Sequence, residues 1–317
     1  MGEHMNAMPT TPGSPSDEVQ VAQAVAPIPR RSALVRALLG WLAVGVGLGL
    51  AIGIPRGIGQ QLALADGAVV AIQSIIMAGF VLAAIVALRH RLDRRSLAGL
   101  GWSWRAGRAG LVGAGVAVLT GIVAWLPAVM LGWIEIESIA VGTFLSFLVV
   151  NTLVIVAYEA LPEEMALRGY VWTNLRDGWG LVFATVVTTA IFPFTAIVAS
   201  SVAWLATSAF GGAPQAPRLF PEGSDPVLYI VQLVAFGLVL VAARRLPIRG
   251  AVLVAAAFHA AHLTVNRLLL GGSGWLDSGW SVRFVEEDAI ALVLVNLVLA
   301  GLMFIVIRRL RQARTPA

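Results

Sequence analysis

Two adjacent acids and an arginine end an otherwise apolar stretch that begins near Ala140: Glu163, Glu164 and Arg168. Charged groups at membrane depth cost several kcal/mol, so a chain that keeps them there usually uses them. If the stretch is helical throughout, Glu164 and Arg168 lie four residues apart on one face and can pair. Glu163 then points elsewhere, and one paired and one free acid suit a general base. The alternative is a helix end at the membrane interface, with the pair as a topological anchor.

A second polar cluster lies in a later apolar run, at His259, His262 and Asn266. A helical spacing puts His262 and Asn266 on one face and His259 on a neighbouring stripe. Such groups are costly in a membrane helix unless they face the interior of the bundle. They suit proton transfer or metal binding, and the alternative is hydrogen bonding between packed helices. Combined with the paired acids, they favour a functional site.

The spacing of these histidines does not predict a zinc site. Zinc hydrolases commonly place His-Glu-x-x-His on one helix, whereas here two alanines separate His259 from His262. A divalent metal such as zinc would have to be held by Glu163, His259 and His262 together. We therefore expect no cofactor that the sequence requires, and keep zinc as the less favoured alternative. The chain has no cysteine, which excludes thiolate sites and cysteine nucleophiles.

Composition places the chain in a membrane. Of its 317 residues, 58% are hydrophobic and 12% are charged, far from the average for soluble domains. The net charge of +5 comes from arginines between apolar runs rather than from a basic stripe with interleaved aromatics. We expect an all-α polytopic membrane protein with about eight transmembrane helices, whose partner is the lipid bilayer and not a nucleic acid. Nothing in the sequence indicates an oligomeric state.

Eight apolar runs are long enough to cross the hydrocarbon core of a bilayer. Arginines gather before the first run, in alternate loops and after the last, while the other loops are acidic or mixed. This alternation predicts that both termini are cytoplasmic. The fourth run ends at Leu161 or continues through the paired acids. The predicted spans are Leu34–Ile54, Gly67–Leu88, Ala109–Gly132, Ala140–Leu161, Gly180–Trp204, Pro226–Ala243, Arg249–Leu269 and Asp288–Ile307.

The chain divides into three parts. Residues 1–29 are rich in Pro, Ser, Ala and Thr without apolar periodicity, which predicts a disordered cytoplasmic tail. Residues 30–310 form the predicted eight-span membrane domain. Residues 311–317 form a basic cytoplasmic tail.

Together, the two clusters resemble the CPBP family, the CAAX-processing and bacteriocin-processing intramembrane endopeptidases also called Abi proteins. The family's Glu-Glu-x-x-x-Arg motif, usually followed by Gly-Tyr, matches residues 163–170, and its His-x-x-x-Asn motif matches residues 262–266. The likeness covers roughly residues 144–269, and eight spans are typical. It implies a bacterial plasma-membrane protein that cleaves a hydrophobic, prenylated (CAAX-like) or leader-peptide substrate.

The family's middle motif, Phe-x-x-x-His, is incomplete. Phe192 is present, and Ala196 stands where the histidine belongs. The resemblance otherwise implies that Glu163 activates water and that Glu164 and Arg168 orient Glu163. It also implies that a histidine and an asparagine, His262 and Asn266 here, bind the oxyanion or polarise water. The family is described both as metallopeptidases and as glutamic peptidases.

We expect an active peptidase in which another group, such as His259, replaces the missing histidine. The alternative is a non-catalytic relative that binds a peptide or lipid-modified segment as an immunity or chaperone-like factor. A small proton-coupled transporter is less favoured, because the sequence shows no internal repeat. The predicted span ends would leave Glu163 and His262 about 10 Å apart along the membrane normal. We expect the fourth helix to extend to about Tyr170, which removes much of that gap.

Overall fold

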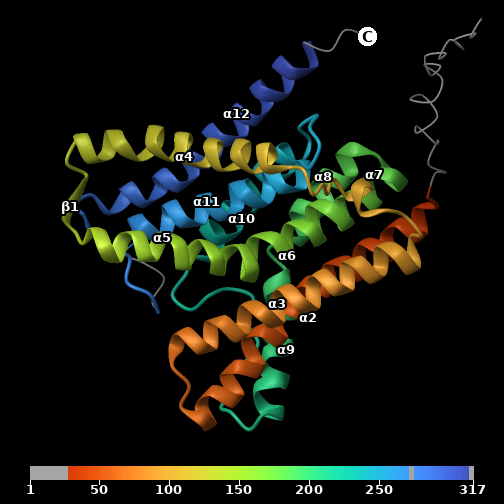
Figure 1. Ribbon diagram of the computed structural model, residues 1–317, viewed down its shortest axis with the longest axis horizontal. Coiled ribbons are helices and arrows are strands. Elements are labelled where there is room, and N and C mark those ends of the chain that lie inside the picture. The colour runs from red at the N-terminus through yellow and green to blue at the C-terminus, as the bar shows by residue number, and fades with distance from the viewer. Residues whose placement is uncertain (1–27, 271–274, 314–317) are drawn as a thin grey trace, which may run out of the picture.

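The computed structural model describes residues 28–270 and 275–313, and Figure 1 shows that they are almost entirely helical. All but two residues of the tail predicted at 1–29, and residues 314–317 of the predicted basic tail, lie outside the described residues. Residues 311–313 continue the last helix. The α-helices are α2 (Arg30–Leu62), α3 (Asp66–Ala87), α4 (Gly107–Met130), α5 (Val141–Ile155), α6 (Leu161–Glu164), α7 (Trp172–Trp179), α8 (Leu181–Ile191), α9 (Thr195–Ala209), α10 (Pro226–Arg244), α11 (Ala251–Leu269) and α12 (Leu292–Ala313).

Shorter elements complete the chain. They are the π-helical turns η1 (Leu88–Leu92), η3 (Val156–Ala160) and η4 (Met165–Val171), the 3₁₀ turns η2 (Leu97–Leu100) and η5 (Glu287–Ala291), and the strands β1 (Ile134–Ile139) and β2 (Trp280–Phe284).

Among the described residues, seven continuous helical stretches are long and apolar enough to cross a membrane, and α8 with α9 makes an eighth if this bent pair is one span. Every predicted span overlaps one of them, so the all-α, multi-pass prediction is confirmed. The fifth span, predicted as continuous over Gly180–Trp204, is bent by 42° between Ile191 and Thr195. Pro193 explains the bend, because proline donates no backbone hydrogen bond and clashes with the preceding turn.

The fourth span is longer than Ala140–Leu161. Its helix runs from Val141 to Trp179 as α5, η3, α6, η4 and α7, so the paired acids lie inside a helix and not at its end. The π-turn η3 ends two residues before Pro162, whose ring would crowd the carbonyl of Tyr158 in an ordinary α-turn. Wide turns of this kind are frequent at functional sites.

The helices form two groups (Figure 1). One contains α2, α3 and α9, and the other contains α4, α5, α10, α11 and α12. Glycines spaced four apart on α2 allow α9 to approach closely: a Cβ added at Gly49 or Gly53 would lie 2.6 Å from a backbone oxygen of α9. Small residues at this spacing are a common means of packing membrane helices.

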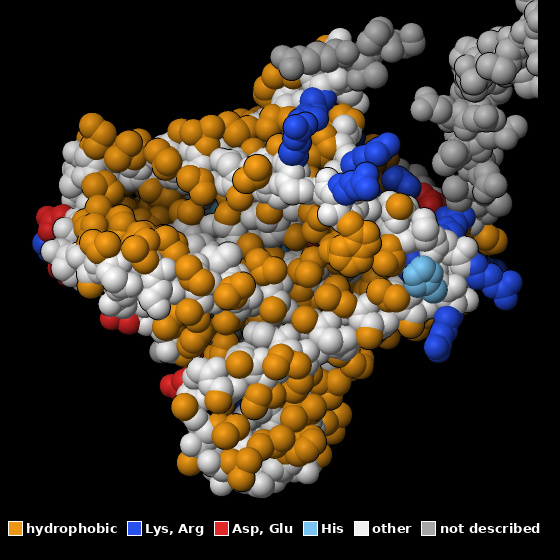
Figure 2. Space-filling view, in the orientation of Figure 1, with side chains coloured by type: hydrophobic (Ala, Val, Ile, Leu, Met, Phe, Trp, Pro, Cys, Tyr) orange, Lys and Arg blue, Asp and Glu red, His pale blue; other side chains and the backbone are white. Residues whose placement is uncertain are grey.

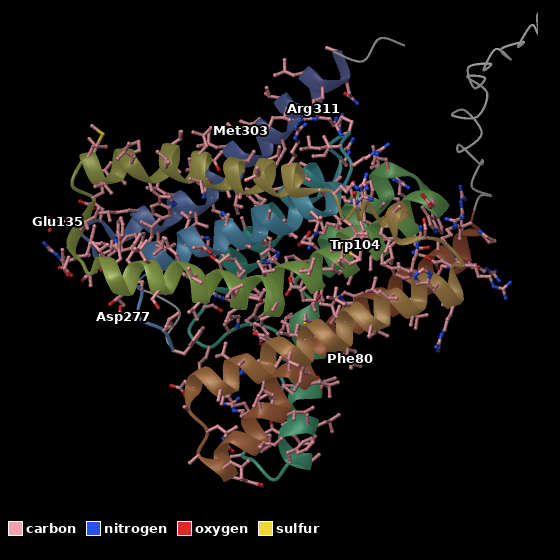
Figure 3. The ribbon with its side chains drawn as sticks, viewed as in Figure 1. Phe80, Trp104, Glu135, Asp277, Met303 and Arg311 are labelled. Atoms are coloured by element: carbon pink, nitrogen blue, oxygen red, sulfur yellow. The ribbon has the colours of Figure 1, made fainter. Side chains whose placement is uncertain are left out.

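A two-stranded antiparallel ribbon forms from two of the loops that the sequence identifies only as acidic or mixed. In β1, isoleucines alternate with Glu135 and Glu137, and Arg283 of β2 forms ion pairs with both acids. Acidic side chains gather at this end of the molecule, and most basic side chains lie at the other end (Figure 2). Figure 3 likewise places Glu135 and Asp277 at the end that carries β1, away from Arg311 on α12.

A buried carboxylate joins helices at the arginine-rich end. Asp93 Oδ1 lies 3.3 Å from Arg36 Nη1 and accepts a hydrogen bond from the Tyr170 hydroxyl at 3.0 Å. Its Oδ2 accepts from Arg89 Nη1 at 3.0 Å and from Asn174 Nδ2 at 3.4 Å. We call these five residues the Asp93 cluster. It fixes α2, η1 and the η4–α7 segment to one another.

Candidate active site

The predicted site residues meet around a cavity of about 220 Å³. Glu163 lines it from the fourth span, and His262 and Asn266 line it from α11. Because Glu163 and His262 line one cavity, they are not separated in depth as the predicted span ends implied. The fourth helix continues beyond Leu161, so Glu163 lies within the span and not at its end. The other lining residues are Leu48, Glu159, Phe192, Pro193, Thr195, Ala196, Tyr229, Gln232, Leu233, Phe236, His259, Leu263 and Leu297.

Glu163 and Glu164 point in different directions, because consecutive helical residues are about 100° apart. Glu163 is partly accessible and lines the cavity. Glu164 is fully buried behind it, and its Oε1 accepts a hydrogen bond from Arg168 Nη1 at 3.1 Å. The structure therefore contains the predicted pair of one arginine-bound acid and one free acid.

His259 connects the buried acid to the cavity. Its Nδ1 lies 3.1 Å from Glu164 Oε1, and the residue also lines the cavity. A carboxylate beside Nδ1 favours the proton on that nitrogen and leaves Nε2 as an acceptor. No described residue forms a hydrogen bond with Nε2 of His259. The sequence placed His259 on a neighbouring stripe and did not predict this contact, because spacing within α11 does not fix how α11 faces the fourth span.

Arg168 is held on several sides. Its guanidinium carbon lies 4.6 Å from the ring centroid of Phe192, which matches the phenylalanine of the middle motif in the resemblance described above. Gly237 of α10 lies beside it, since a Cβ there would be 3.4 Å from Arg168 Nη2. Its Nε and Nη2 are buried and have no hydrogen-bond partner among the described residues. Arg168 therefore lies behind the cavity wall and orients Glu164.

His262 is fixed by two amides. Its Nε2 lies 3.1 Å from Asn266 Nδ2, as the four-residue spacing predicts. Its Nδ1 lies 3.3 Å from Nδ2 of Asn296, a fully buried residue of α12. Sequence reasoning missed Asn296. The available signal was an isolated amide in an apolar span, which is costly unless it has a partner.

A second missed group borders the cavity at Glu159. Arg267 Nη2 donates to Glu159 Oε1 at 2.5 Å, and Arg267 Nη1 donates to Asn151 Oδ1 at 3.0 Å. Asn151 Nδ2 also donates to the Thr264 hydroxyl at 3.3 Å. These contacts join the fourth span to α11 beside the site and help to fix the distance between Glu163 and the histidines.

Ala196 lies in the cavity wall, where the resemblance leads us to expect a histidine. It also lines a neighbouring, mostly apolar cavity of about 250 Å³ between α2, α9 and the 215–221 segment, with Arg56 and Arg218 among its lining residues. Leu48 and Tyr229 line both cavities as well. A small side chain at position 196 therefore leaves the polar cavity next to an apolar one.

The side chains do not fit the metal alternative. In residues 28–270 and 275–313, no group of three or more His, Asp or Glu residues could hold a metal ion. His259 leaves only Nε2 toward the cavity, because Nδ1 lies beside Glu164, and both ring nitrogens of His262 face amides. Glu163, His259 and His262 share the cavity without forming a ligand set.

Comparison with known proteins adds no family assignment. No family model, curated protein or solved structure matches the chain.

Proposed function

We propose that this protein is an intramembrane endopeptidase of the CPBP type, in which Glu163 activates water for attack on a peptide bond. The observation that carries the proposal is the shared cavity: a free acid and a histidine backed by a second, arginine-bound acid line one small chamber among membrane helices. Buried ionisable groups of this kind are expensive in a membrane and are usually functional.

In the proposed reaction, one water occupies the cavity between Glu163 and His259. Glu163 removes one of its protons, His259 Nε2 accepts a hydrogen bond from the other, and the oxygen attacks the peptide carbonyl carbon. The amide of Asn266 donates to the oxyanion that forms. Glu163 then passes its proton to the leaving nitrogen as the C–N bond breaks, giving a carboxylic acid and an amine. Glu164 and Arg168 position His259, and His262 and Asn296 position Asn266.

A hydrophobic substrate fits the surroundings. The apolar cavity beside Ala196 has room for a large side chain or part of a prenyl group next to the water site. The substrate is a prenylated CAAX-type peptide or the leader of a secreted peptide. The protein acts in the bacterial plasma membrane with both termini in the cytoplasm, in keeping with basic side chains at one end of the bundle (Figure 2).

Cleavage assays with purified protein test the proposal. A prenylated CAAX-type peptide and a bacteriocin-leader peptide are incubated with the parent, with Glu163→Gln and with Glu286→Gln, an acid in the β2–η5 connection far along the chain from the site. We expect cleavage by the parent and by Glu286→Gln, and a loss of about 10²- to 10⁴-fold in Glu163→Gln. Cleavage that survives in Glu163→Gln would contradict the assigned base.

Ala196 favours a second candidate function, a non-catalytic relative that binds a peptide or lipid-modified segment in the same cavity. The missing histidine removes one side of the water site known from the family motif. Ala196→His separates the two candidates. Cleavage by Ala196→His but not by the parent, with peptide binding in both, would assign the parent to binding.

A further inference from the structure

An apolar groove of about 400 Å³ lies between α8, α10 and α12, outside the catalytic cavity. Leu238 of α10 and Val298 and Leu302 of α12 line it and are about half exposed. Arg245 and Arg308 line the same groove at the arginine-rich ends of α10 and α12. An apolar channel that ends at two cations has the shape and polarity of a lipid site.

The two arginines have no acidic partner among residues 28–270 and 275–313. Arg308 Nε is buried and forms no hydrogen bond with any described residue. Burial lowers the pKa of Arg245, and the nearby positive charge of Arg308 lowers it further. Two cations that oppose each other, with a donor left unused, need an anion to offset them.

We propose that Arg245 and Arg308 bind the phosphate of an anionic phospholipid whose acyl chain lies in the groove. Guanidinium groups bind phosphate oxygens with charge-assisted, often bidentate hydrogen bonds. The apolar walls favour a lipid over a free anion, because an acyl chain would remove their apolar surface from water and a fully hydrated ion would not. The site lies where basic residues collect, which is the level at which anionic headgroups of the cytoplasmic leaflet are expected.

Lipid-dependent thermal unfolding of the full chain in detergent tests this site. Phosphatidylglycerol and phosphatidylcholine with identical acyl chains are titrated into the parent and into Arg245→Gln/Arg308→Gln. We expect phosphatidylglycerol to bind the parent and to raise its Tm well above the effect of phosphatidylcholine. Removing both arginines should weaken phosphatidylglycerol binding by about tenfold or more. Arg249→Gln and Arg309→Gln, which remove exposed arginines nearby, are the matched controls and should keep the difference.

Gly301 gives an independent test of the groove itself. A Cβ at this position meets only Val239 Cγ2 at 3.6 Å, so Gly301→Ala should fold and bind lipid as the parent does. Gly301→Leu places its longer side chain in the groove and should abolish the preference for phosphatidylglycerol. Equal effects of the two lipids on the parent, or an unchanged preference in the double arginine variant, would overturn the proposal. Stabilisation by inorganic phosphate equal to that by phosphatidylglycerol would overturn the role of the acyl chain.

Discussion

In the part of the chain that the structure describes, two buried carboxylates, Asp93 and Glu164, bind arginines, and they are used differently. In the Asp93 cluster, both carboxylate oxygens have two partners each, drawn from three parts of the chain. In Glu164, both partners, Arg168 and His259, contact Oε1, while Oε2 is buried with no described partner. Arg168 likewise keeps two buried nitrogens unused.

The difference separates a structural contact from a chemical one. A buried carboxylate with partners on both oxygens mainly stabilises the fold, whereas a buried carboxylate oxygen and arginine nitrogens without described partners are costly and require an explanation. The Asp93 cluster holds helices together at the arginine-rich end. The Glu164–Arg168–His259 group touches the cavity, where a change of charge during a reaction could use its spare capacity. Variants in the Asp93 cluster should therefore mainly lower stability, and variants in the Glu164–Arg168–His259 group should mainly lower activity.

The largest expected effect is on the stability of Asp93→Ala. It leaves Arg89, which is 3% exposed, without its carboxylate, and breaking a buried pair in this way costs about 3–5 kcal/mol. Thermal unfolding in detergent measures the loss. Asp93→Asn, which keeps hydrogen bonds to Tyr170 and Asn174 but removes the charge, should lose less. If both variants unfold like the parent, the cluster is not a structural contact.

The next effect is on the activity of His259→Gln. Glutamine can still donate to Glu164 but supplies no imidazole to the cavity, so we expect peptide cleavage to fall at least about 10²-fold with a much smaller change in Tm. The matched control is His90→Gln, an exposed histidine of η1, which should leave cleavage unchanged. Equal losses of Tm in His259→Gln and Asp93→Ala would remove the distinction drawn above.

A smaller effect is expected from Tyr170→Phe. The change deletes one hydrogen bond to Asp93 Oδ1 and leaves Arg36 in place, so the free energy of unfolding should fall by about 1 kcal/mol. Equilibrium unfolding is the measurement, and the rate of peptide cleavage per folded molecule should not change. A large fall in that rate would mean that the Asp93 cluster also shapes the site.

The smallest effect should come from Arg283→Gln in the β-ribbon. Arg283 and its partners Glu135 and Glu137 are about half exposed, and exposed ion pairs contribute at most about 1 kcal/mol. The Tm should therefore shift little, and less so at high salt. A shift comparable to that of Asp93→Ala would show that the ribbon holds the helix ends together.

Sequence patterns predicted what one helix determines by itself. Hydropathy located every span, and four-residue spacing predicted the contacts of Glu164 with Arg168 and of His262 with Asn266. The contacts of His259 with Glu164 and of Asn296 with His262 depend on how separate helices are rotated against each other, which spacing within one helix does not fix. They could not be predicted from one sequence.

Two further features had local signals that were not used. Pro193 in the fifth span indicates a break, and the alternation of isoleucine with Glu135 and Glu137 is typical of a strand. The paired strands lie far apart in the sequence. The ribbon itself therefore depends on the arrangement of the helices that flank the two strands, which are α4 and α5 for β1 and α11 and α12 for β2. That both partners of Glu164 contact Oε1 and none contacts Oε2 depends on the neighbouring helices, and the sequence alone does not show it.

The π-turn before Pro162 has a consequence for the permitted length of the chain. A π-turn accommodates one more residue than an α-turn, so the loss of one residue from Val156–Ala160, combined with Pro162→Ala to avoid a clash with the preceding turn, would leave an ordinary helix whose two ends keep their directions. The loss of one residue from the middle of α11 would instead rotate every later side chain by about 100° and turn Asn266 away. With Pro162 replaced, the helix that carries the acids can therefore shorten by one residue and keep Glu163 on the cavity, whereas the helix that carries the histidines cannot.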